Sequence, residues 1–162
     1  MNILTGDAAL QTAIELEELG RDLYDSLAAI SVDPRLIRLC RGLAAAERQH
    51  ERTFRELRED LAAKERTVLV SDADLAEARR ALKQAVVPDR TGMIGAVDAS
   101  AEIDLLKQAA AMERNSISYF RNLSINATEG DLLLRILEEE LGHLRLIEEL
   151  VSQMESEAPI VS

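Results

Sequence analysis

One short stretch, Glu140-Leu141-Gly142-His143, and its counterpart, Glu47-Arg48-Gln49-His50, indicate both the fold and the chemistry of this chain. The sequence contains two histidines, and each lies three residues after a glutamate. Residues three apart in an α-helix lie on one face, with Cβ atoms about 5–6 Å apart. A carboxylate and an imidazole at that separation can bind the same metal ion. The two stretches therefore predict two helices, each carrying part of a metal site.

Apolar residues around both stretches recur every three or four positions, as on the buried face of a helix. One stripe runs through Leu36, Cys40, Leu43, Glu47, His50, Phe54, Leu57 and Leu61, and the other through Leu133, Ile136, Glu140, His143, Ile147, Leu150 and Met154. Each Glu–His pair thus lies mid-stripe, where burial of polar groups is costly unless something satisfies them. We predict helices over 34–65 and 129–155.

Two further helices are predicted upstream of these, over 7–30 and 99–124. Glu17 lies on the apolar stripe of the first and Glu113 on that of the second, and an aromatic residue follows each after seven positions, Tyr24 and Phe120. A glutamate and a Glu-x-x-His motif therefore occur in the same order in both halves of the chain. This repeated pattern indicates an internal duplication of one helical hairpin.

Turn signals divide the chain between these helices. Asp33-Pro34 combines a helix-capping residue with a proline suited to a first helical position. Residues 66–97 are expected to form a crossover, with an extended stretch over 66–70, a short helix from the Ser71 cap to about Val86, and a turn over 88–92. A second turn is expected over 126–131. The predicted fold is all-α: a four-helix bundle of two hairpins joined by a long crossover that contains a short helix.

Distances along the helices predict that the four glutamates meet at one level. Glu17 and Glu47 lie 16 and 14 residues from Asp33 in the first turn, or roughly 24 and 21 Å at about 1.5 Å per residue. Glu113 and Glu140 lie 14 and 13 residues from the middle of the second turn, or roughly 21 and 20 Å. If both hairpins pack into one bundle, the four glutamates and two histidines converge in the core.

Four carboxylates and two imidazoles suit a pair of divalent cations. Four ionised glutamates in an apolar bundle would be very costly, and two divalent cations cancel their charge. Oxygen and imidazole ligands favour iron or manganese, and a single cysteine excludes a thiolate-rich site. Di-iron and di-manganese bundles use this set, a Glu from two helices and Glu-x-x-His from two others. The predicted ligands are Glu17, Glu47, His50, Glu113, Glu140 and His143.

Composition limits the classes of partner. A net charge of −11 argues against nucleic acid, because phosphate binding needs a basic surface. No apolar run is long enough to span a membrane, and the first ten residues lack the pattern of a signal peptide. We therefore expect a cytoplasmic protein that binds neither nucleic acid nor membrane. Residues 1–156 are expected to form a single domain and 157–162 a flexible tail.

Four segments carry a resemblance to the rubrerythrin branch of the ferritin-like superfamily: AIELEELGRDLYDSLA (13–28), AAAERQHERTF (44–54), AAMERNSISYF (110–120) and LEEELGHLRLI (137–147). The resemblance implies two iron ions at the six ligands, bridged by the glutamates of the Glu-x-x-His helices, with manganese or zinc as alternatives. It also implies that Tyr24 matches a tyrosine of the family near the metals. We leave open whether Tyr24 acts there or is a core tyrosine that needs a hydrogen-bond partner.

The chain departs from the family pattern in three respects. It has no paired Cys-x-x-Cys motifs of a rubredoxin-like tail, so the resemblance implies an external electron-donor protein. Ser116 stands where rubrerythrins carry a seventh carboxylate, so the ligand exchange of those proteins does not carry over. Phe120 stands at the position equivalent to Tyr24.

The resemblance implies redox chemistry on H2O2 or O2, as a peroxide reductase or ferroxidase, in a homodimer or higher homo-oligomer. The alternatives are an iron-binding or storage oligomer of ferritin type without peroxidase turnover, and a structural module without turnover.

Several further residues yield expectations. Gly20 and Gly142 interrupt helices, where glycine costs about 1 kcal/mol relative to alanine. We expect close helix packing at both, or, at Gly20 and Ser116, room for O2 or peroxide. Cys40 is expected in the core. The glutamates beside the ligands are expected to be surface charges: Glu15, Glu18, Glu138 and Glu139.

Overall fold

The computed structural model describes residues 6–65, 68–89, 97–123 and 127–158. These residues contain five helices: α1 (Gly6–Ile30), α2 (Pro34–Ala63), α3 (Asp72–Gln84), α4 (Ala99–Asn122) and α5 (Ala127–Glu157). The all-α prediction is confirmed, and every predicted helix is present. Several boundaries differ by one or two residues: α1 begins at Gly6, α2 ends at Ala63, α3 at Gln84 and α4 at Asn122, and α5 runs from Ala127 to Glu157. Residues 127–131, predicted as part of a turn, therefore belong to α5. Glu65, after the end of α2, adopts a left-handed backbone with φ of 53°.

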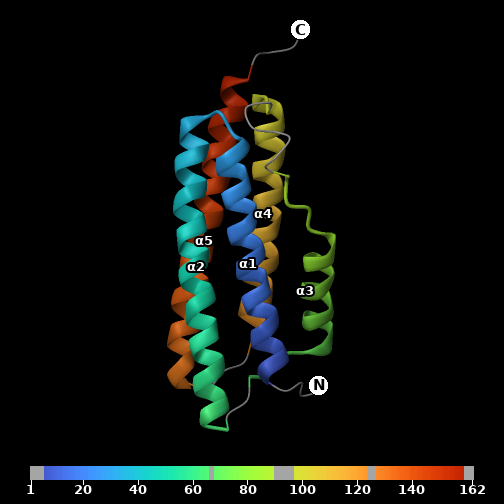
Figure 1. Cartoon of the computed structure of the whole chain (residues 1–162), viewed down its shortest axis with the longest axis vertical. Coiled ribbons are helices and arrows are strands. Elements are labelled where there is room, and N and C mark those ends of the chain that lie inside the picture. The colour runs from blue at the N-terminus through green and yellow to red at the C-terminus, as the bar shows by residue number, and fades with distance from the viewer. Residues whose placement is uncertain (1–5, 66–67, 90–96, 124–126, 159–162) are drawn as a thin grey trace.

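The four long helices form a bundle of two antiparallel hairpins, α1–α2 and α4–α5 (Figure 1). The hairpins lie side by side, with α1 against α4 and α2 against α5. The crossover helix α3 lies along the outside of the bundle and packs on α1 and α4 (Figure 1). The predicted order of hairpin, crossover with a short helix, and hairpin is therefore confirmed.

Helix caps explain where the chain turns. Asp33 accepts a hydrogen bond from the backbone N–H of Arg35 at 2.8 Å, with Pro34 in the first helical position as expected. Ser71 caps α3 by accepting from the backbone of Asp74 at 3.1 Å. Of the other predicted turns and the tail, residues 66–67, 90–92, 126 and 159–162 lie outside the described part of the chain.

A buried glutamate that the sequence analysis did not single out ties the first turn to α4. The carboxylate of Glu102 accepts hydrogen bonds from the backbone N–H groups of Val32 and Asp33, at 2.7 and 3.1 Å. These donors precede α2, and a charged acceptor satisfies them within the protein. The contact fixes the height of the first hairpin relative to the second.

The apolar core consists of two clusters with a polar layer between them. One includes Leu10, Ile14, Phe54, Phe120 and Ile136, near the beginning of α1 and the end of α4. The other includes Leu27, Leu36, Leu106, Ile147 and Met154, toward the opposite end of the bundle. In all four long helices, the predicted ligands fall in the stretch between the residues of these two clusters. The two apolar clusters thus position and enclose the polar residues.

Candidate metal centre

All six predicted ligands are buried in the middle of the bundle, and none is more than 8% exposed. Glu17 comes from α1, Glu113 from α4, the Glu47–His50 pair from α2 and the Glu140–His143 pair from α5. Their spacing places them on the core-facing side of each helix because they share the period of the apolar residues. The structure therefore brings together every residue that the sequence analysis named as a ligand.

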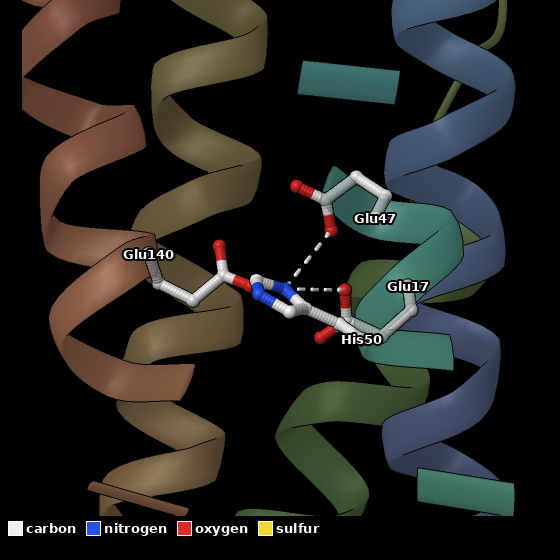
Figure 2. A group of neighbouring side chains, drawn as sticks. All are labelled: Glu17, Glu47, His50 and Glu140. Atoms are coloured by element: carbon white, nitrogen blue, oxygen red, sulfur yellow. Dashed lines mark hydrogen bonds and ion pairs between the residues drawn. The ribbon is translucent and has the colours of Figure 1, made fainter. Parts of the chain in front are cut away.

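The first half of the site surrounds the imidazole of His50 (Figure 2). Its Nδ1 lies 2.8 Å from Glu140 Oε1, 3.4 Å from Glu17 Oε2 and 4.0 Å from Glu47 Oε2. Glu140 belongs to the other hairpin, so this half is complete only when the hairpins pack together. Figure 2 shows the carboxylates of α1 and α2 on one side of the ring and that of α5 on the other.

The second half has the same design around His143. Its Nδ1 lies 3.2 Å from Glu47 Oε1, 3.3 Å from Glu140 Oε2 and 3.8 Å from Glu113 Oε1. Here Glu47 is the ligand from the other hairpin. The two imidazoles stack with centroids 5.6 Å apart and an angle of 20° between their planes.

The two halves share Glu47 and Glu140 and therefore form one dinuclear arrangement. In each four-residue cluster, one ligand atom per residue lies within 4.8 Å of the other three. Ligands at about 2.0–2.2 Å from one ion are at most about 4.4 Å apart, so small rotations of side chains suffice to close each cluster. Glu47 and Glu140 each offer one oxygen to each cluster, as a bridging carboxylate would.

Unsatisfied polar atoms show that this residue set fits metal ions. Buried polar groups nearly always have hydrogen-bond partners. Among the described residues, the ligand atoms that lack one are Glu17 Oε1 and Oε2, Glu47 Oε1, Glu140 Oε2 and His143 Nδ1. Such a concentration of unpaired acceptors in an apolar core would be very costly on its own. Cations bound among these atoms would remove that cost.

In the metal-free protein, protons supply part of the missing positive charge. Burial raises the pKa values of Glu17 and Glu113 well above the ordinary range, and neighbouring glutamates raise them further. Burial would lower the pKa values of His50 and His143, but their glutamate partners outweigh it and raise both to about 9. Burial also opposes ionisation of Glu140, yet the two neighbouring histidines lower its pKa. Protons and metal ions therefore compete for the same atoms.

Comparison with known proteins agrees with this geometry. The rubrerythrin family model matches residues 8–94, which is more than half of the chain. The chain belongs to the rubrerythrin family. Searches of curated proteins and of solved structures returned no match. The matched region covers Glu17, Glu47 and His50, and the ligands of the second hairpin lie beyond it.

Membership of the rubrerythrin family implies di-iron binding, and the two clusters are able to hold metal ions. The match also confirms the family resemblance, and it covers two of the four segments on which that resemblance was based, 13–28 and 44–54. Together with the bundle, it makes the fold ferritin-like. Within the described residues, no helix has the length and apolar character needed to cross a membrane.

Tyr24 contacts the candidate centre directly. Its buried hydroxyl donates a hydrogen bond to Glu113 Oε1, from α1 across to α4. Burial and the charge of Glu113 raise the pKa of Tyr24 well above its usual value, so the phenol keeps its proton. Tyr24 is thus a core tyrosine with a partner, and that partner is a predicted ligand.

Glu139 makes a contact with the candidate centre that the sequence analysis missed. It was expected to be a surface charge, and the side chain is 59% exposed, yet its Oε2 lies 2.7 Å from His50 Nε2. The expected surface position is therefore confirmed, and the contact with His50 is the feature that was not expected. Its position directly before Glu140 could have indicated this contact, because both glutamates of α5 contact His50 on α2.

Two glycines beside the ligands differ from each other. A Cβ on Gly20 would lie 3.3 Å from Glu47 Cδ, so close packing at Gly20 is confirmed, and the packed group is a predicted ligand. A Cβ on Gly142 would meet only the guanidinium of Arg145, at 4.0 Å. The expectation of close packing is therefore wrong at Gly142. Cys40 is buried as expected, and burial raises its pKa to about 12.

Proposed function

We propose that the protein binds two iron ions at the six-residue centre and performs redox chemistry on H2O2 or O2. The observation that carries this proposal is the sharing of Glu47 and Glu140 by two histidine-containing clusters. Shared carboxylates hold two ions as neighbours, whereas two separate sites would not need them. A pair of ferrous ions can supply the two electrons that convert H2O2 and two protons into two water molecules.

The protein residues have separate roles in this proposal. Glu17 and His50 would hold one ion, Glu113 and His143 the other, and Glu47 and Glu140 would bind both. The buried position of these groups excludes bulk water, which strengthens every charge interaction within the site. The apolar clusters on both sides keep the ligands in place when the charge of the ions changes.

The hydroxyl of Tyr24 orients one of the predicted ligands, Glu113. The hydroxyl of Tyr24 points at Glu113 Oε1, and burial favours the protonated forms of both groups. We propose that the proton on the Tyr24 oxygen stays there and orients Glu113, while the Glu113 carboxyl releases its own proton when metal binds.

The proposed centre lies nearest to solvent on the His143 side, because His143 is the most exposed of the six predicted ligands. A surface groove between α2 and α5 reaches the His143 ring and is lined mainly by Arg35, Arg38, Leu39, Gly42 and Leu146. A small neutral molecule such as H2O2 can approach along it. We propose that electrons come from an external donor protein.

Stopped-flow mixing of the ferrous-loaded protein with H2O2, and separately with O2, tests the proposal. We expect the bound iron to become ferric with at least one oxidant, in a phase that consumes one H2O2 per two irons. Glu138→Ala is the matched control, since Glu138 is exposed and lies beside the ligands without contacting them. The proposal fails if neither oxidant changes the oxidation state of the bound iron. Uptake of many irons per chain would favour the storage alternative.

A further inference from the structure

The two imidazoles of the centre are held in different ways. His50 has a carboxylate at each ring nitrogen: Glu140 Oε1 lies 2.8 Å from Nδ1, and Glu139 Oε2 lies 2.7 Å from Nε2. Two consecutive residues of α5 thus contact the two ring nitrogens of one histidine on α2. Among the described residues, every ion-pair contact of His143 is made through Nδ1.

The sequence explains this difference between the halves. Glu139 directly precedes Glu140, and at the equivalent place in the first hairpin Ala46 directly precedes Glu47. Alanine has no side-chain acceptor, so Ala46 of α2 cannot contact the second ring nitrogen of His143 as Glu139 of α5 contacts that of His50. His143 is also less enclosed, with 10% of its side chain exposed against 2% for His50, and it lines the surface groove between α2 and α5.

We propose that Glu139 is a positioning residue that holds the His50 ring with Nδ1 toward Glu17 and Glu140, so that the first metal ion fills the His50 half. This inference rests on the proposed metal centre. A carboxylate on the second nitrogen fixes the ring and its tautomer, and loss of such a partner costs about 10–100-fold in metal affinity. Glu139 itself is largely exposed, but the ring that it holds is buried.

Zinc titration followed by ¹⁵N NMR tests the order of filling, because the chain has two histidines and Zn²⁺ is diamagnetic. Histidine-selective ¹⁵N labelling gives one set of ring nitrogens for each, assigned with a His143→Gln variant. In the unmodified protein, we expect the His50 nitrogens to shift during the first equivalent of Zn²⁺ and those of His143 during the second. Simultaneous shifts, or His143 shifting first, would overturn the inference.

Three variants test the role of Glu139. Glu139→Ala should lower the affinity for the first Zn²⁺ by about 10–100-fold and abolish the order of filling. Glu139→Gln should retain the order, since its amide oxygen can still accept from Nε2–H. Glu138→Ala should behave as the unmodified protein. An unchanged order in Glu139→Ala would refute the positioning role, and circular dichroism checks that this variant folds.

Failure of this inference and failure of the centre give different results. If neither histidine shifts with Zn²⁺, the metal centre itself is wrong. If both shift together, the centre stands and the inequality of its halves is wrong. The titration order in the unmodified protein remains decisive even if Glu139→Ala does not fold.

Discussion

The hairpins α1–α2 and α4–α5 carry the same ligands in the same order but surround them differently. Glu17 and Glu113 have equivalent places, as do the two Glu-x-x-His motifs. Around them, Tyr24 corresponds to Phe120, Gly20 to Ser116 and Ala46 to Glu139. The comparison teaches that the duplicated pattern builds a symmetric set of ligands, while the residues beside it make the two halves of the centre unequal.

The aromatic pair shows how far the halves have diverged. Tyr24 donates to Glu113, a ligand in the other hairpin. Phe120 has no hydroxyl and packs on Phe54 instead, with ring centroids 5.0 Å apart. Tyr24 therefore contributes to the polar layer, whereas Phe120 at the equivalent position belongs to the adjacent apolar cluster.

Removal of a shared ligand should have the largest effect, because it should break both halves at once. Glu47→Ala and Glu140→Ala should each abolish binding of both ions, whereas Glu17→Ala and Glu113→Ala should each remove one. Elemental analysis after loading with Fe²⁺ measures the metal content per chain, with Glu138→Ala as the control. Two ions per chain in Glu47→Ala would contradict the shared role of that carboxylate.

The two histidines share one direction of pKa shift, as do Glu17 and Glu113, so pH should affect both halves in the same direction. The pKa values of His50 and His143, about 9 against an ordinary 6.5, contribute stability that is full below pH 6.5 and lost as pH rises through 9. The raised pKa values of Glu17 and Glu113 act in the same direction, because the folded state binds protons that the unfolded state releases.

The unfolding temperature of the metal-free protein should therefore decrease as the pH rises from 6 to 9. Metal binding needs deprotonated ligands, so the gain in unfolding temperature on adding Mn²⁺ should widen over the same range. Calorimetry with EDTA and with Mn²⁺ measures both curves. If the difference in unfolding temperature between the Mn²⁺ and EDTA samples became smaller as pH rose, protons and metal would not compete at these ligands.

Much of the centre could be predicted because its ligands repeat at helical spacing. Glu17 and Glu113 lie on apolar stripes, and equal distances from the turns place them opposite their partners. The remaining contacts depend on packing between helices distant in sequence. Glu139 lies 89 residues from His50, Glu102 caps a turn 70 residues before it, and Tyr24 meets a ligand of the other hairpin. No local spacing encodes these contacts.

Tyrosine hydroxyls provide a smaller test of the same inequality. Tyr24→Phe removes the partner of Glu113 and should cost about 1–3 kcal/mol of unfolding free energy in the metal-free protein. Tyr119→Phe is a matched control, since its buried hydroxyl donates to the backbone oxygen of Ala9 at 2.8 Å, away from the centre. Both should be destabilised in chemical denaturation, but only Tyr24→Phe should alter metal affinity. Equal metal affinity in both variants would show that Tyr24 does not contribute to metal binding.

The glycine pair should give the smallest effect. Gly142→Ala meets open space and should stabilise the protein by up to about 1 kcal/mol, the helix-propensity gain. Gly20→Ala should lose most of that gain, because its Cβ would lie 3.3 Å from Glu47 Cδ. Thermal unfolding of the metal-free variants measures the difference. Equal stabilisation by both substitutions would show that the Glu47 side chain can move away from the added Cβ at no cost.

Anomalous X-ray diffraction from iron-loaded crystals tests the dinuclear centre most directly. We expect two iron peaks within the bundle, both beside the carboxylates of Glu47 and Glu140. One should lie next to Glu17 and His50, and the other next to Glu113 and His143. A single peak, or iron bound only outside the bundle, would contradict a centre assembled from the two hairpins.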